Sequence, residues 1–266
     1  MMSKKSSIGW RLALVCLMCV GLAAACPALS AEATARQREV AAKFKDAVIR
    51  AKVVLKMRGT YEGESHEEEQ TNETTATVID PSGLAVASLT SVDPAYALQA
   101  MSQGTEDTKY EAEVTDLKMR FPDGKEVPAK VVLRDKDLDL AVIRPAEKLT
   151  GPVPAIDLSN SAKPEVLDEV LILDRLGEVA NQVAAVSLDR IEAVVDKPRT
   201  FYIAGLFSKI TGTPGCPVLS SDGKMIGVVV IRMLPRSGAS SRKDRVLPMI
   251  LPAADVLEVV KQVPPQ

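Results

Sequence analysis

A loop rich in glycine and proline, TGTPGCPVL, spans Thr211–Leu219 and is followed by DGKMIGVV over Asp222–Val229. An Asp-Gly dipeptide favours a tight turn, and the apolar residues on either side of it are typical of paired strands. Pro214 stands out in the loop, because proline has neither a side-chain hydroxyl nor a backbone N–H. The sequence therefore predicts a loop that leads into a hairpin, with strands at Pro217–Leu219 and Met225–Ile231.

Short apolar segments separated by turn residues continue on the N-terminal side of this loop and beyond it. Thr75–Ser88 and Leu117–Val132 each read as strand, turn and strand, with proline and glycine in the turn. Further strands are predicted at Val48–Met57, Leu138–Arg144, Val170–Leu173, Gln182–Val186, Ile191–Val195, Thr200–Ile203 and Val246–Pro252. Gly59–Asn72, which contains three consecutive glutamates, is predicted to be a solvated acidic loop. Repeated short strands of this kind indicate barrels or a sandwich.

Two segments have apolar residues at helical spacing instead. They are Ala31–Lys45, before the first strand, and Ala253–Val263, after the last one. This spacing predicts amphipathic helices at both ends of the strand-rich region.

The N-terminus has the features of a secretory signal peptide. Basic residues precede the apolar run Leu12–Ala25, and small residues follow it up to Ala31, where we expect cleavage. The run is shorter than the about 20 residues that a membrane span needs, so export is preferred over a membrane anchor, with a periplasmic or secreted product. The sequence around Cys26 also resembles a loose lipoprotein box, which leaves a lipid anchor at Cys26 as the alternative.

Composition narrows the classes of partner and of chemistry. The formal net charge of -2 becomes more negative when the three basic residues of the leader are lost, which disfavours nucleic acid and anionic membrane surfaces as partners. Three of the four cysteines, Cys16, Cys19 and Cys26, lie in the leader, so Cys216 has no partner for an intramolecular disulfide. We find no glycine loop for phosphate and no Cys/His metal spacing, and expect neither a cofactor nor a metal.

The order of these elements resembles the protease domain of the HtrA/Deg branch of trypsin-like serine proteases, over roughly Val48–Val263. Val78–Ala87 resembles the hairpin before the catalytic histidine, and Asp123–Val132 with Asp137–Ile143 resembles the Asp-Gly turn and the Thr-Asp-Leu-Ala-Val motif of that family. Gly212–Leu219 is similar to the nucleophile loop Gly-x-Ser-Gly-Gly-Pro-Leu, and Leu247–Val263 to the closing strand and helix. The resemblance implies an all-β, trypsin-like double β-barrel of the PA clan with N-terminal and C-terminal helices.

With two barrels, the chain divides into five parts. Residues 1–31 are the signal peptide, 32–47 an N-terminal helical segment, 48–148 the first barrel, 149–164 a linker with several prolines, and 165–266 the second barrel with the C-terminal helix.

The resemblance also places the catalytic positions. Asp139 matches the triad aspartate, Thr90 or Ser91 falls at the histidine position, and Pro214 falls at the serine position. Ser-His-Asp chemistry needs a nucleophile, a base and an acid that orients the base, and Pro214 would remove the nucleophile together with one oxyanion-hole donor. Asp139 would then be vestigial, an acceptor for backbone N–H groups or for hydroxyls such as those of Thr90 and Ser91. Candidate binding residues in the former nucleophile and oxyanion loop are Gly212, Thr213, Gly215 and Cys216.

Two residues were weighed as replacements for the lost groups. His66 is the only histidine, but it lies in the acidic segment before the hairpin that should deliver the base, so we expect it to be solvated. Cys216 lies two residues past the nucleophile position, where the chain enters a strand. Without an imidazole nearby its thiol would stay protonated, and we expect a buried, inert cysteine.

Three functions are compatible with this sequence. The leading hypothesis is an exported pseudoprotease that binds a peptide or protein by strand addition, a mode that needs main-chain groups and no nucleophile. The alternative is an active serine or cysteine endopeptidase with a relocated site that uses Cys216, Ser208 or Thr213 with Asp139 or His66. A third possibility is a structural envelope component whose cleft is filled by its own side chains. The identity of a partner stays open.

Overall fold

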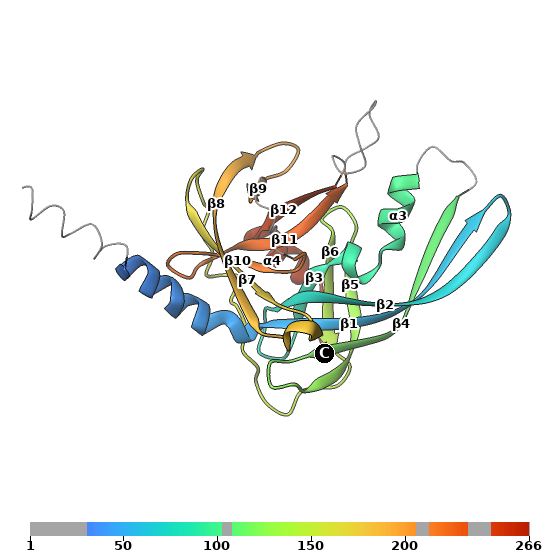
Figure 1. Cartoon of the computed structure of the whole chain (residues 1–266), viewed down its shortest axis with the longest axis horizontal. Coiled ribbons are helices and arrows are strands. Elements are labelled where there is room, and N and C mark those ends of the chain that lie inside the picture. Colours follow the sequence, from blue (N-terminus) through green and yellow to red (C-terminus); the bar gives the residue numbers. More distant parts are fainter. Residues whose placement is uncertain (1–30, 103–107, 206–212, 234–245, 266) are drawn as a thin grey trace, which may run out of the picture.

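A computed structural model describes residues 31–102, 108–205, 213–233 and 246–265, and its strands form two closed antiparallel barrels (Figure 1). The strand order is β1-β2-β3-β6-β5-β4 in the first barrel and β10-β11-β12-β9-β8-β7 in the second. This arrangement confirms the predicted all-β, trypsin-like double barrel, and helices flank it at both ends as expected.

The elements of each barrel follow one another along the chain. The first barrel contains β1 (Val48–Tyr61), β2 (Glu64–Val78), β3 (Ala85–Ser88), β4 (Lys109–Arg120), β5 (Glu126–Asp135) and β6 (Leu140–Pro145). The second contains β7 (Glu169–Arg175), β8 (Ala184–Val195), β9 (Phe201–Ala204), β10 (Pro217–Ser220), β11 (Met225–Met233) and β12 (Val246–Pro252). The helices are residues 31–44, η1 (Lys45–Ala47), α2 (Leu89–Val92), α3 (Ala95–Ser102), η2 (Glu178–Ala180) and α4 (Ala253–Val260). Among these described helices, none combines the length and the apolar character needed to cross a membrane.

Alternation along the strands divides the apolar residues among three clusters. One fills the first barrel around Leu55 and Met119, and another fills the second barrel around Ile172 and Val218. The third lies between the barrels, where residues such as Leu140 of β6 and Val228 of β11 pack together with Val40 and Phe44 of the N-terminal helix and Val256 of α4. Because successive side chains of a strand point to opposite faces, one strand can contribute to its own barrel and to this interface. The barrels are thereby held together at the place where a trypsin-like site is expected.

The predicted acidic loop at Gly59–Asn72 is wrong, since these residues continue β1 and β2 into a long hairpin. Its turn lies at Glu62 and Gly63, which both have positive φ, 50° and 85°, as a two-residue hairpin turn requires. The register places Lys56 opposite Glu69 and Arg58 opposite Glu67, and Glu67 accepts a 2.8 Å hydrogen bond from Arg58 Nε. Opposite charges across the strands explain how so polar a segment forms a sheet.

A second correction concerns the two strands predicted at Gln182–Val186 and Ile191–Val195. They are parts of the single strand β8, which pairs with β7 through its first half and with β9 from Ile191 onward. The polar residues between the two apolar segments had suggested a break, but they are accommodated because β8 lies at the surface of its barrel.

Candidate functional site

Asp139 lies in the turn before β6, and its side chain is fully buried. Its carboxylate accepts three hydrogen bonds: 2.6 Å from the Ser88 hydroxyl, 2.7 Å from the backbone N–H of Thr90, and 2.7 Å from the backbone N–H of Ile231. These donors come from the end of β3, from α2 and from β11, so both barrels hold the same carboxylate. The carboxylate that was predicted at the position of the triad aspartate is therefore hydrogen-bonded by one hydroxyl and two main-chain N–H groups.

Burial has a direct electrostatic effect on this group. It raises the pKa of Asp139 above its ordinary value of 3.8, while the hydrogen bonds from Ser88, Ile231 and Thr90 act in the opposite direction because they favour the ionised form. The result is a carboxyl group that is well hydrogen-bonded and yet poorly solvated.

Thr90 and Ser91, the two candidates for the histidine position, lie in α2 directly after β3. Thr90 contacts Asp139 through its backbone N–H, whereas its hydroxyl oxygen is buried and has no hydrogen-bond partner among the described residues. The hydroxyl group that donates a hydrogen bond to Asp139 belongs to Ser88, one residue before the helix. Among the described contacts there is none between Ser91 and Asp139. His66 lies in the exposed arm of β2, opposite Gly59 of β1. No imidazole therefore meets Asp139.

Pro214, at the serine position, is half-buried in the loop before β10. The next residue, Gly215, has a φ of +96°, and a Cβ atom there would lie 2.1 Å from the carbonyl oxygen of Thr75. Its carbonyl oxygen accepts a 2.7 Å hydrogen bond from the hydroxyl of Thr77, and that of Pro214 accepts one of 3.4 Å from Thr74. Only glycine fits at position 215, because β2 passes so close to the loop. Gly212 and Ser208 lie outside the described residues.

Strand β11 connects the two halves of this site. The backbone N–H of Gly215 donates to the carbonyl oxygen of Val229 at 2.8 Å, and the N–H of Val229 donates to Cys216 at 2.9 Å. Two residues further along the same strand, the N–H of Ile231 donates to Asp139. The loop at Pro214 and the carboxylate of Asp139 are thus attached to neighbouring residues of one strand.

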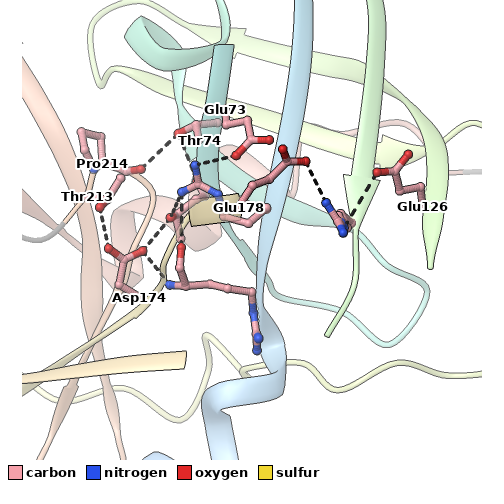
Figure 2. A network of polar contacts seen from close by, with 11 residues as sticks. Glu73, Thr74, Glu126, Asp174, Glu178, Thr213 and Pro214 are labelled. Atoms are coloured by element: carbon pink, nitrogen blue, oxygen red, sulfur yellow. Dashed lines mark hydrogen bonds and ion pairs between the residues drawn. The ribbon is translucent and has the colours of Figure 1, made fainter. Parts of the chain in front are cut away.

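A second carboxylate, which sequence reasoning missed, lies beside the loop. Asp174 of β7 accepts hydrogen bonds from the hydroxyls of Thr213 at 2.5 Å and of Thr75 at 2.7 Å, and from the backbone N–H of Arg175 at 2.7 Å (Figure 2). Arg50 donates to the Thr75 hydroxyl at 3.0 Å, which extends the network into β1. The available signal was an Asp-Arg pair directly after the apolar run of β7, because a charged pair at the end of a buried strand needs partners.

The buried guanidinium of Arg175 crosses from the second barrel to the first. It donates to the carbonyl oxygens of Val48 at 2.6 Å, Lys45 at 2.8 Å and Gln182 at 2.9 Å. Burial lowers the pKa of Arg175 below its ordinary value, and nearby Asp46 acts in the opposite direction. Arg120 of β4 forms ion pairs with both Glu126 and Glu178, and the pair with Glu178 links η2 to the first barrel (Figure 2). These contacts fix the orientation of β7, and with it Asp174.

Cys216 is fully buried within the second barrel. Burial raises the pKa of its thiol well above the ordinary value, and the carboxylate of Asp174 raises it further. A thiol in these surroundings stays protonated at neutral pH and is out of reach of a substrate, so the geometry gives it no nucleophilic role.

Two further side chains near Asp139 were not identified from the sequence. Tyr96 of α3 is half-buried, and its pKa is raised by burial and then by the negative charge of Asp139. Arg232 of β11 lies over the ring of Phe201, 5.2 Å from its centroid, and donates to the carbonyl oxygen of Asp137 in the first barrel. Arg232 thus spans from one barrel to the other, next to Ile231, which donates to Asp139.

Two surface cavities formed by described residues lie away from this site. One of about 540 Å³ is formed by Phe121, Val127 and residues 149–154, and another of about 600 Å³ is lined by Leu84, Arg144 and part of the same segment. Neither is lined by Asp139 or by the loop at Pro214. Within the described ranges, no three His, Cys, Asp or Glu side chains come together as a possible metal site.

The comparison with known proteins agrees with this geometry. Residues 74–228, more than half of the chain, match the trypsin-like peptidase domain. No curated protein matches the sequence. The matched region begins on β2, includes Asp139 and the loop at Pro214, and ends on β11, so it contains the strands that build the site. Two antiparallel barrels joined at this site and a family match over most of both lead to one assignment: the chain belongs to the trypsin-like peptidase domain family.

Proposed function

We propose that this protein is an exported pseudoprotease, a trypsin-like double barrel that has lost peptidase chemistry and binds a peptide or protein in place of cleaving one. Export rests on the signal-peptide features of residues 1–31, with the lipid anchor at Cys26 as the variant of the same proposal. The ligand is a peptide or protein, and its identity remains to be found.

The hydrogen bonds on Asp139 carry this proposal. In a working triad the aspartate orients a histidine, whereas here Ser88, Thr90 and Ile231 occupy the carboxylate. Pro214 supplies neither a nucleophile nor an N–H for an oxyanion, while the close contact of Gly215 with Thr75 preserves the loop. The groups that only peptide-bond hydrolysis requires are missing, and the groups that hold the loop against the first barrel are present.

Binding can use the main chain of β11. Beyond Ile231, no described strand pairs with β11 on the side of β10, whereas β12 pairs with it on the other side as far as Met233. An extended peptide can add to such an edge through backbone hydrogen bonds alone. Arg232, anchored to Asp137 and Phe201, would border the peptide.

The alternative, a relocated hydrolase, is less well supported. Thr213 donates to Asp174, but that carboxylate also accepts hydrogen bonds from Thr75 and from the backbone N–H of Arg175 and is a weak base for a hydroxyl. Cys216 is buried and protonated. Ser208, the third nucleophile considered, lies outside the described residues.

The test uses protein produced from the full 266-residue chain. It is incubated with a fluorophosphonate probe, a thiol-reactive probe and unfolded casein, beside Cys216→Ala and Thr213→Val. We expect no labelling above the heat-denatured control and no cleavage. Saturable labelling, together with cleavage that one of the two variants abolishes, would establish a relocated enzyme instead.

The binding half of the proposal has its own readout. Unfolded casein added to the intact protein should slow amide hydrogen exchange in β11 without being cleaved. Slower exchange elsewhere, with the exchange of β11 unchanged, would refute binding at this edge. The loss of catalysis would not be affected by that result.

A further inference from the structure

Exposed apolar side chains are concentrated on one part of the second barrel. Of the eight large apolar side chains that are exposed in the described residues, seven lie between residues 166 and 188. They are Val166, Leu167, Leu176, Val179, Val183, Val186 and Leu188. Single exposed apolar residues are ordinary, but a concentration of this kind along the β7–β8 hairpin and just before it indicates an interaction surface.

Part of this surface is a strand edge that pairs with no other strand among the described residues. Ala184–Arg190 of β8 pairs with β7 on one side, and β9 pairs with β8 only from Ile191 onward. On the second side of residues 184–190, the described part of the chain places no strand. Figure 1 shows β8 at the margin of the second barrel.

The edge also lacks the features that protect open strands. Proline is absent from Ala184–Leu188, charges begin only at Asp189, and Val186 and Leu188 are 48% and 54% exposed. These two side chains share a face with Leu173 and Leu171 of β7, which are buried in the cluster between the barrels. Native proteins cover such edges or place charges on them, because an open apolar edge recruits another strand.

We propose that β8 pairs with β8 of a second copy of this chain, antiparallel and centred on Ser187. In a two-fold pair of this kind the partner strand presents the same sequence in reverse, and residues opposite each other face the same side. Centring on Ser187 places Val186 of each copy against Leu188 of the other. The four side chains then form one apolar cluster across the symmetry axis.

The charges of the strand fit the same register. Asp189 lies opposite Ala185 and Arg190 opposite Ala184, so no like charges face each other across the new ladder. A foreign apolar strand would use the same edge without needing this symmetry. The self-complementary sequence favours a second copy.

The first test measures association of the intact protein by sedimentation velocity over a range of concentrations. We expect a monomer–dimer equilibrium that is lost in Val186→Lys/Leu188→Lys. The matched control, Val179→Lys, changes an exposed valine in η2, away from the edge, and should leave the dimer intact. Thermal unfolding and near-UV circular dichroism establish that each variant is folded.

The second test examines the register and does not depend on the charged variants. Ser187→Cys brings two cysteines to the symmetry axis, within disulfide distance, and should form a covalent dimer on mild oxidation beyond that of the unmodified protein. Asp189→Cys is the control, because its two cysteines would lie roughly 14 Å apart along the strands. A protein that stays monomeric at every concentration would overturn the proposal. So would a dimer that keeps its affinity in Val186→Lys/Leu188→Lys, or one in which both cysteine variants cross-link equally.

Discussion

The hydroxyl of Thr213, the residue directly before Pro214, donates a 2.5 Å hydrogen bond to the carboxylate of Asp174. This bond ties the loop at Pro214 to β7, and Asp174 extends it to Thr75 on β2. The loop is thus held by a carboxylate with no counterpart among the expected catalytic residues.

Asp174→Ala should lower the free energy of unfolding by about 1–3 kcal/mol, because the hydroxyls of Thr213 and Thr75 lose a buried acceptor. Urea unfolding followed by circular dichroism measures this. Asp116→Ala, which removes only an exposed ion pair with Lys118, should change stability by less than about 0.5 kcal/mol. Equal effects of the two substitutions would contradict the role given to Asp174.

Gly215→Ala should destabilise the protein far more than Gly124→Ala. Both glycines have positive φ, so each substitution costs about 1–2 kcal/mol for a left-handed backbone. A Cβ at position 124 meets nothing within 4 Å, whereas at position 215 it would lie 2.1 Å from the carbonyl oxygen of Thr75. Unfolding free energies of the two variants measure the cost of this clash, and similar values would show that β2 and the loop are not in close contact.

The stability of the protein should carry a pH dependence that comes from Asp139. Its pKa is raised in the folded state, so the unfolded chain loses this proton at a lower pH than the folded one does. Stability from this group is therefore fully present below its ordinary pKa of 3.8 and is lost as the pH rises through the raised value.

Asp139→Asn, which does not titrate, isolates this effect. We expect the unfolding free energy of the wild type to fall, relative to that of the variant, as the pH rises from 3.8 toward neutrality. Urea unfolding at a series of pH values provides the difference. A difference that is constant with pH, or that changes in the opposite direction, would rule out a raised pKa.

Arg175→Met should cost about 3 kcal/mol of stability, because three backbone carbonyls lose a buried donor. Arg175→Lys should recover little of this, since one ammonium cannot reproduce the guanidinium fork. The matched change Arg190→Met removes an exposed ion pair with Glu169 and should be nearly neutral. Denaturant midpoints of the three variants test the order, and full rescue by lysine would show that charge alone matters.

Local patterns located most of the strands, whereas the double barrel was predicted from the resemblance to trypsin-like proteases. Turn residues and apolar alternation located most strands, and the loop at Pro214 lies before β10 as its glycine and proline content indicated. The hairpin of β1 and β2 was missed because its polar residues show no apolar alternation, and its cross-strand charge pairs, such as Arg58–Glu67, become visible only once the register is known. Asp174 and Arg175 were missed for a similar reason, since their partners are distant in sequence.

Strand β11 holds the site through its main chain and not through its side chains. Gly215 and Asp139 are held by the carbonyl oxygen of Val229 and the N–H of Ile231, atoms that every residue except proline supplies. A change of side chain at Val229 or Ile231 to any residue but proline therefore leaves these two contacts intact. Because the main chain of β11 holds the loop and Asp139, these contacts place no demand on the side chains of Val229 and Ile231, which can therefore be selected for another function.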